Sequence, residues 1–279
     1  AVGSDLAAEA GLEVEIAQGG PGRSPLRAAV TGPAHYATSS TTKLIPAVAQ
    51  GMPLVAVAGF RQRTLRALIL HADDPAVSFE DLDGRRLKAR PEDLWLSYLQ
   101  NRYNLDLAII PHDFGMGQFV SDRELVQQAL VTSEPLFLAA NDIPFRMLSL
   151  HDAGYDNFDV LFTTRDRVEN HPAEVQAVVT LFNEGWVRYL NGDGSEANAK
   201  IAAANPQLSS EHLRERHRLL VSFYAEDGLT GEAVAAISSE RLSEQIAMLE
   251  DLGRLEAGLV SAEDLYTAEF IESFGSELN

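Results

Sequence analysis

The sequence predicts an α/β protein with two α/β units followed by a helical tail. Apolar runs of strand length alternate with helical segments up to about residue 166, and only helical patterns follow. Strands that alternate with helices in this way are typical of α/β sandwiches. The 279 residues suffice for one large or two medium domains, and 46% apolar with 23% charged residues is the composition of a globular chain.

Four short strands are expected in the first unit. Alternating apolar and acidic residues predict a strand with one buried face at Leu12–Ile16. The uninterrupted apolar run Leu54–Phe60 is typical of a strand buried on both faces of a parallel sheet. His35–Thr38 and Leu65–Leu70 are the other two candidates.

Helix start signals separate these strands. Ser24 fits an N-cap followed by Pro25 at the first helical position, which predicts a helix over Leu26–Thr31. Several hydroxyl residues precede a second predicted helix, Lys43–Gln50, which ends where Gly51 follows.

The second unit is expected to begin after the turn at Asp81–Gly84. Its predicted elements are strands at Arg86–Ala89, Asp106–Pro111, Leu130–Thr132 and Met147–Leu150, with helices at Pro91–Arg102 and Asp122–Ala129. One further strand is predicted at Val160–Thr163.

The remainder of the chain is predicted to be helical. A long helix begins at His171-Pro172 and continues to Tyr189, with Val175, Val178, Val179, Phe182 and Trp186 on one apolar face. Further helices are predicted at about 195–204, 209–224, 230–234, 238–252 and 264–274.

The composition excludes several classes of function. Against 22 basic residues the chain has 41 acidic ones, so its net charge of −19 would repel phosphate backbones and argues against nucleic-acid binding. With no cysteine, the chain cannot form disulfides, thiolate metal sites or cysteine nucleophiles. No apolar run approaches the roughly 18 residues that cross a bilayer. The chain opens without a basic and apolar leader, as expected of a cytosolic protein or of a mature exported one.

Catalytic motifs are not found either. The seven histidines show no HExxH or other metal-ligand spacing, and no Gly-x-Ser-x-Gly elbow occurs. Acid–base chemistry by Glu134 or His112 is conceivable, but no pattern supports it.

A set of short motifs occurs in a characteristic order along nearly the whole chain. They are Glu9–Ile16, Gly19–Gly22, Ala49–Val57, Glu80–Arg86, Thr132–Pro135, Val160–Thr164 and Leu265–Phe270. In this order they resemble the NMT1/THI5-like solute-binding proteins of bacterial ABC importers, which carry nitrate, sulfonates, taurine or thiamine-type pyrimidines. The resemblance implies a type II periplasmic-binding-protein fold, in which two α/β sandwiches are joined by two crossings and a helical C-terminal tail follows.

On this resemblance, lobe one comprises 1–81 plus 158–279 and lobe two 82–157, with a ligand bound in the interlobe cleft. The protein is then expected to be a periplasmic or lipid-anchored monomer that delivers a small molecule to a membrane permease, without a cofactor, a metal or a catalytic residue. The alternative is an enzyme or ligand sensor on the same fold. Two enzymes of this fold use cysteine chemistry, which a chain without cysteine cannot perform.

Candidate binding residues in the first lobe lie at turns and strand ends. The run Thr38-Ser39-Ser40-Thr41-Thr42 offers hydroxyls and helix N–H groups to a ligand oxygen, or it serves only as an N-cap. Arg23 follows a Gly-rich turn and is either an anion ligand or a solvated side chain. Gln62 follows the buried strand Leu54–Phe60 and either reaches the ligand or solvates the hinge.

In the second lobe, Glu134 follows a short strand and is expected to accept hydrogen bonds from a nitrogen heterocycle, or else to form a salt bridge or cap. Arg90 and Glu92 begin a predicted helix, where a structural role is the alternative. Phe114 is the candidate for stacking on a flat ligand. Asp152 and Tyr155 precede the second crossing and are secondary candidates, with a polar turn as the alternative.

Two ligand classes remain open. The acidic residues Glu92, Asp93, Glu134 and Asp152, together with Phe114 and Tyr155, favour a neutral or cationic nitrogen heterocycle such as a thiamine-precursor pyrimidine. The rival ligand is a sulfonate, taurine or nitrate, held by Arg23, Arg61 or Arg90 and the helix start at Ser39–Thr42.

Overall fold

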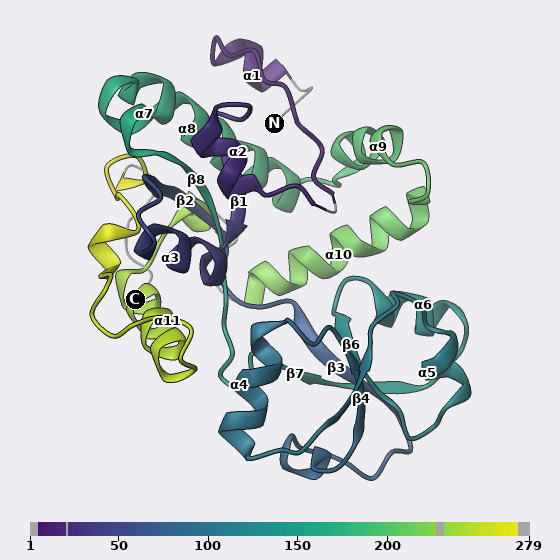
Figure 1. Cartoon of the computed structure of the whole chain (residues 1–279). Helices are drawn as coiled ribbons and strands as arrows, with labels where there is room; N and C mark the ends of the chain where they lie inside the picture. Colours follow the sequence, from purple (N-terminus) through teal and green to yellow (C-terminus); the bar gives the residue numbers. More distant parts are fainter. Residues whose placement is uncertain (1–4, 21, 227–231, 273–279) are drawn as a thin grey trace. The chain divides into compact units, whose positions relative to one another are not determined.

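The computed structural model describes residues 5–20, 22–226 and 232–272 (Figure 1). The chain forms two compact units: unit 1 comprises Ala1–Gln62 with Asn157–Asn279, and unit 2 comprises Arg63–Asp156. The chain therefore leaves unit 1 once and returns to it once.

Unit 1 is built on a three-stranded sheet of order β1-β8-β2. The strands are β1 (Ala37–Ser40), β2 (Leu54–Arg61) and β8 (Asp159–Thr164). The run Leu54–Phe60 is a buried strand as predicted, but the parallel pairing expected for it is wrong, because β2 and β1 both pair antiparallel with β8. The reason is connectivity: β2 leads out of the unit and β8 returns into it, so the two strands run in opposite directions.

Helices account for most of the rest of unit 1. They are α1 (Asp5–Glu9), α2 (Pro25–Thr31), α3 (Thr41–Ala49), α7 (Arg165–Asn170), α8 (Pro172–Asn191), α9 (Ser195–Ala204), α10 (Ser210–Glu226) and α11 (Ser239–Asp251). Short 3₁₀ turns occur at Glu232–Ala235 and Ala262–Asp264. The predicted helical tail is confirmed over 172–226 and 239–251, whereas the helix expected at 230–234 is a 3₁₀ turn over Glu232–Ala235, with residues 230 and 231 outside the described ranges. Ser24 caps α2 by accepting a hydrogen bond from the backbone N–H of Arg27.

Two predicted elements of unit 1 are wrong. Leu12–Ile16 is not a strand, and Ile16 is 65% exposed. Its alternating pattern needs a neighbouring strand, and in the described part of the chain none pairs with it. The helix expected at 264–274 is absent over 264–272, where Leu265 and Phe270 are buried in irregular backbone; residues 273 and 274 lie outside the described ranges.

Unit 2 contains a five-stranded mixed sheet of order β5-β4-β6-β3-β7. The strands are β3 (Arg66–His71), β4 (Arg86–Ala89), β5 (Ala108–Pro111), β6 (Val126–Leu130) and β7 (Phe145–Ser149), with helices α4 (Leu94–Tyr103), α5 (Gly117–Ser121) and α6 (Glu134–Ala140) and a 3₁₀ turn at Glu80–Leu82. In Figure 1, α4 lies to one side of these strands and α5 and α6 lie to the other. The segment 63–81, which the sequence analysis placed in lobe one, groups with unit 2 because β3 pairs with β6 and β7.

The helix predicted at Asp122–Ala129 is wrong, since Val126–Leu130 forms strand β6. Good helix formers occupy this segment, yet β6 lies between β3 and β4, and four of its residues are buried. Pairing on both sides therefore outweighs the local preference.

Candidate functional site

The ends of the strands in unit 2 define one edge of its sheet. Strand β4 pairs parallel with β5 and β6, and β3 pairs antiparallel with β6 and β7, so β4, β5, β6 and β7 all end at the same edge. We call this the carboxyl edge of unit 2. The segments that follow these strands there are Arg90–Asp93, His112–Phe114, Val131–Glu134 and Leu150–Asp152. Ligands of α/β sheets usually bind at such an edge.

Five of the predicted site residues are thus brought to this edge, namely Arg90, Glu92, Phe114, Glu134 and Asp152. Phe114 is exposed, at 76%. Its backbone has φ +63°, a conformation that a bulky residue rarely adopts. An unburied aromatic ring held in such a turn is available to stack on a flat ligand.

His112 lies beside Phe114 and was not among the predicted binding residues. The rings are 5.2 Å apart in an edge-to-face arrangement, and the Phe114 N–H donates to His112 Nδ1 at 3.0 Å. Burial lowers the pKa of His112, and the nearby charge of Glu134 opposes that shift. The other ring nitrogen, Nε2, is buried and has no hydrogen-bond partner among the described residues.

Glu134 is the first residue of α6 and is half-buried. Its Oε2 accepts a hydrogen bond from the backbone N–H of Leu130 at 2.8 Å, which closes the turn between β6 and α6. The carboxylate sits at the helix start, where the dipole favours negative charge. Its other oxygen, Oε1, carries no hydrogen bond from the described residues.

Arg90 and Asp93 form a local ion pair at the same edge. The Arg90 guanidinium donates to Asp93 Oδ1 at 3.0 Å and to Oδ2 at 3.3 Å. Asp93 also accepts from the Trp95 indole at 3.1 Å and pairs with Arg66 at 3.2 Å. Arg90 therefore already has a carboxylate partner, which it shares with Arg66, whereas Glu92 is exposed.

Asp152 and Tyr155 differ sharply in their surroundings. Asp152 is exposed in the turn after β7, while Tyr155 is 3% exposed and packs against Tyr98 with ring centroids 5.4 Å apart. Asp152 is therefore open to a solute in the structure, whereas the ring of Tyr155 is part of the core of unit 2.

A buried lysine supports the loop that carries Phe114. Lys88 on β4 is 1% exposed, and its Nζ pairs with Asp113 Oδ1 at 2.5 Å and donates to the Gly115 carbonyl at 3.2 Å. The Lys88 ammonium lowers the pKa of Asp113. A lysine between the apolar residues Leu87 and Ala89 of a predicted strand was a signal in the sequence that the predictions did not use.

In unit 1, β1 and β2 end at the edge where β8 begins. Ser40 and Arg61 each pair with Asp159 in the sheet, and Arg61 also forms an ion pair with the Asp159 carboxylate. Thr38 is exposed and Ser39 is half-buried, while Ser40 Oγ lies 3.1 Å from Thr42 Oγ1.

Thr41 and Gln62 make contacts inside unit 1. Thr41 is fully buried, and its hydroxyl lies 2.5 Å from Oε1 of Gln245 on α11. Gln62 is 2% exposed and donates from Nε2 to the Ala236 carbonyl at 2.6 Å. Arg23 lies apart from both residues in an exposed loop, where it donates to the Gln18 carbonyl at 2.8 Å.

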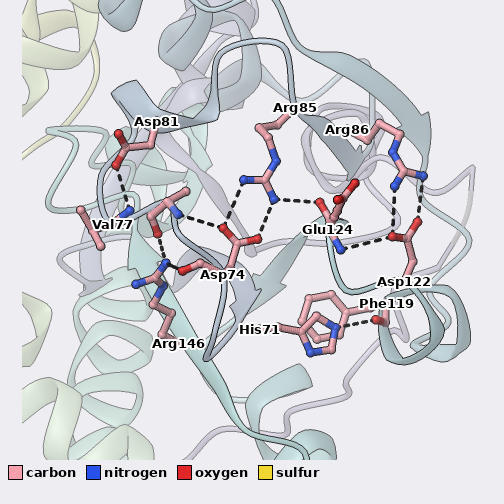
Figure 2. A network of polar contacts seen from close by, with 11 residues as sticks. His71, Asp74, Val77, Asp81, Arg85, Arg86, Phe119, Asp122, Glu124 and Arg146 are labelled. Atoms are coloured by element: carbon pink, nitrogen blue, oxygen red, sulfur yellow. Dashed lines mark hydrogen bonds and ion pairs between the residues drawn. The ribbon is translucent and has the colours of Figure 1, made fainter.

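A second polar cluster lies where β3 ends and β4 begins (Figure 2). The buried Asp74 carboxylate accepts from Arg85 at 2.6 and 3.1 Å and from the Ala76 N–H at 2.9 Å, and Arg146 donates to the Asp74 and Ala76 carbonyls. A surface hollow of about 440 Å³ adjoins it, lined by Asp73, Asp74, Pro75, Arg85, Arg123 and Glu124. Because Arg85 pairs with Asp74 and Arg123 pairs with Asp73, this cluster is suited to stabilise the segment that connects β3 to β4.

The described part of the chain holds no group of three or more metal-ligating side chains. Among the same residues, no helix combines the length and apolar character needed to span a membrane. The carboxyl edge of unit 2 instead offers the exposed ring of Phe114, the carboxylates of Glu92, Glu134 and Asp152, and the half-buried imidazole of His112. These groups can bind a small flat molecule by stacking and hydrogen bonding.

Comparisons with known proteins agree with this architecture. The NMT1/THI5-like family model matches residues 8–192, so the chain belongs to this family. No match was found among curated proteins.

Several solved structures share the fold. A putative periplasmic sulfonate-binding protein, SsuA from Methylobacillus flagellatus KT, is 15% identical with a TM-score of 0.59, over 89% of this chain and 77% of that one. The alkanesulfonate-binding protein SsuA from Xanthomonas axonopodis pv. citri, bound to MOPS, is 12% identical with a TM-score of 0.57, over 87% and 84%. The desulfurization enzyme DSZB is 13% identical with a TM-score of 0.60, over 97% and 93%. The predicted periplasmic-binding-protein fold is thereby confirmed.

Proposed function

We propose that this chain is an extracytoplasmic solute-binding protein of an ABC importer. The observation that carries the proposal is that Phe114, His112 and Glu134 follow strands that end at the carboxyl edge of unit 2, in a member of the NMT1/THI5-like family. Ligand binding would shift the protein toward a ligand-bound conformation that a membrane permease recognises. The protein acts as a periplasmic or lipid-anchored monomer.

The favoured ligand is a nitrogen heterocycle of the thiamine-precursor pyrimidine type. Two of the three arginines expected to hold an anionic ligand are already paired with carboxylates, Arg61 with Asp159 and Arg90 with Asp93, whereas Arg23 donates to the Gln18 carbonyl. The buried Lys88 is likewise paired, with Asp113. A sulfonate would have to displace those partners, whereas a neutral heterocycle can use the Phe114 ring and the Glu134 carboxylate directly. The rival ligands are sulfonates, taurine and nitrate, and the likeness to sulfonate-binding proteins supports them.

A thermal-shift screen with aminopyrimidines, taurine, alkanesulfonates and nitrate tests the proposal, with calorimetry on every hit. We expect an aminopyrimidine to stabilise the protein and Phe114→Ala to weaken its binding about tenfold, because stacking on the ring is lost. The matched control is Phe137→Ala, which removes another exposed phenylalanine of unit 2, on α6. Stabilisation by none of the compounds, or turnover of any one, would contradict the transport role and favour an enzyme on this fold.

A further inference from the structure

We propose that the side chain of Asp156 clasps together the two connections between unit 1 and unit 2, and that this clasp confines bending to the backbone of Arg63 and Asn157. Unit 2 begins at Arg63 and ends at Asp156, so the chain passes between the units at 62–63 and again at 156–157. The inference goes beyond the proposed function, because it does not depend on which solute the protein binds.

On the unit 2 side, the Asp156 carboxylate bonds to the first connection. Its Oδ1 accepts from the backbone N–H of Thr64 at 3.0 Å, and its Oδ2 lies 2.6 Å from Nδ1 of His151. Because a carboxylate only accepts, the proton of the second contact is on Nδ1. Hydrogen bonds to an ionised group are the stronger kind, so Asp156 joins the start of unit 2 to its end.

Both sides of the clasp are anchored within unit 2. Thr64 is 4% exposed, and its Oγ1 accepts from the backbone N–H of Arg66 at 3.2 Å. Tyr155, the residue before Asp156, is buried and donates its N–H to the Leu150 carbonyl at 2.9 Å. Neither side of the clasp can therefore turn without breaking contacts in the core of unit 2.

On the unit 1 side, each connection reaches a buried residue. Gln62 is 2% exposed and donates from Nε2 to the Ala236 carbonyl at 2.6 Å. Phe158 is fully buried, and its carbonyl accepts from both the N–H and the hydroxyl of Thr41, at 2.9 and 3.2 Å. These contacts fix Gln62 and Phe158 to unit 1.

One residue of each connection is left between the fixed positions. Arg63 is the single residue between the position held by unit 1 and the position held by unit 2 on the first connection, and Asn157 is its counterpart on the second. Both are half-buried. A hinge needs only a few residues that absorb a change of φ and ψ, so any rearrangement of the units passes through these two.

The register of the unit 1 sheet is consistent with the clasp. Strands β2 and β8 pair antiparallel up to Arg61 and Asp159. Thr64 comes three residues after Arg61 and Asp156 three residues before Asp159, so the two residues of the clasp hold corresponding places on the two connections. The carboxylate of Asp156 accepts the Thr64 N–H there, as a backbone carbonyl does within a sheet.

Amide hydrogen exchange measured by NMR on the full chain tests the clasp. In Asp156→Ala the Thr64 amide should exchange at least about tenfold faster, because its acceptor is lost. Asp156→Asn should keep most of the protection, since the amide oxygen still accepts. The matched control is Asp152→Ala, which removes an exposed carboxylate from the turn that precedes Asp156 and should leave Thr64 exchange unchanged.

Nitrogen relaxation of the wild-type protein tests the position of the hinge. The backbone order parameters of Arg63 and Asn157 should lie clearly below those of the residues on either side, which should be close to the rigid value of about 0.85. In Asp156→Ala the lowered values should spread to Thr64.

Two results would overturn the proposal. The clasp is wrong if Thr64 exchange is unchanged in a folded Asp156→Ala protein, or if the wild-type Thr64 amide exchanges as in an unstructured chain, a result that needs no variant. Order parameters at Arg63 and Asn157 as high as those of their neighbours would refute the hinge position. These outcomes leave the solute-binding function untouched, because the thermal-shift screen tests it separately.

Discussion

The two partners of the ion pair between Lys88 and Asp113 in unit 2 differ in burial, so their removal should affect the stability of the protein differently. Lys88 is 1% exposed, but the carboxylate of its partner Asp113 is 67% exposed. Removing the buried cation leaves a carboxylate that water can solvate, whereas removing the carboxylate leaves an uncompensated buried ammonium. Removing Asp113 should therefore destabilise the protein more than removing Lys88.

We expect Lys88→Met, which keeps the shape of the side chain, to change the free energy of unfolding by no more than about 1 kcal/mol. Asp113→Asn should lower the urea midpoint clearly more than Lys88→Met does, because the ammonium stays buried. Urea denaturation of both variants measures the difference. Equal losses for both variants, or a larger loss for Lys88→Met, would contradict the asymmetry.

Asp74 is the residue whose ionisation should control acid stability. Burial alone would raise its pKa, but the hydrogen bonds from Arg85 and Ala76 and the charge of Arg85 outweigh it, so the pKa is lowered on folding. The unfolded chain then binds the proton more readily than the folded one. The stabilisation is present above the unfolded pKa of about 3.9 and is lost as the pH falls through the folded value.

Asp74→Asn should lower the free energy of unfolding by about 1–3 kcal/mol near pH 7, and the difference from wild type should shrink as the pH approaches about 3. The matched control is Asp73→Asn, since the neighbouring Asp73 pairs with Arg123 on the surface, and both side chains are mostly exposed. It should leave the profile nearly unchanged. A loss for Asp74→Asn that is independent of pH would contradict this account.

At the scale of the elements, the sequence predicted helix starts correctly where they depend on a few neighbouring residues. Ser24 with Pro25 marked the start of α2, and Pro172 marked the start of α8. The helix predicted over the β6 segment was wrong, because the strand conformation of β6 depends on pairing with β3 and β4, which are distant in sequence. The hydrogen bond from the Phe114 N–H to His112 Nδ1 could not be predicted either, because it requires the left-handed backbone at Phe114.

Strand β2 depends on a glycine for its packing. A Cβ atom built on Gly59 would lie 2.2 Å from the Ala236 carbonyl oxygen, so no side chain fits there without moving the backbone of 236. Gly59→Ala should destabilise the protein by about 1–3 kcal/mol. Gly20→Ala is the control, because no atom lies within 4 Å of its added Cβ. Thermal unfolding that is equal for the two variants would refute this role of Gly59.

At the scale of the whole molecule, the two units differ in how the chain builds them. All five strands of the unit 2 sheet come from the continuous segment Arg63–Asp156, while unit 1 needs segments from both ends of the chain. The fold class was predictable because it depends on the order of strands and helices. The grouping of β3 with unit 2 could not be predicted, because it depends on the pairing of β3 with β6 and β7.

A fragment comprising 63–156 should therefore fold alone, whereas 1–62 should not. Trp95, which is buried in α4, is the only tryptophan of that fragment and reports on its unfolding. We expect a cooperative urea transition in its fluorescence. A gradual change without a transition would show that unit 2 requires the rest of the chain.

The proposed transport role is tested most directly by native mass spectrometry of the full chain after prolonged incubation with 4-aminopyrimidine or taurine. The small molecule is then released from the protein and its mass is measured. A solute-binding protein should hold one molecule per chain and release it chemically unchanged. Conversion of the recovered compound, or the absence of any bound solute at saturating concentration, would contradict the account.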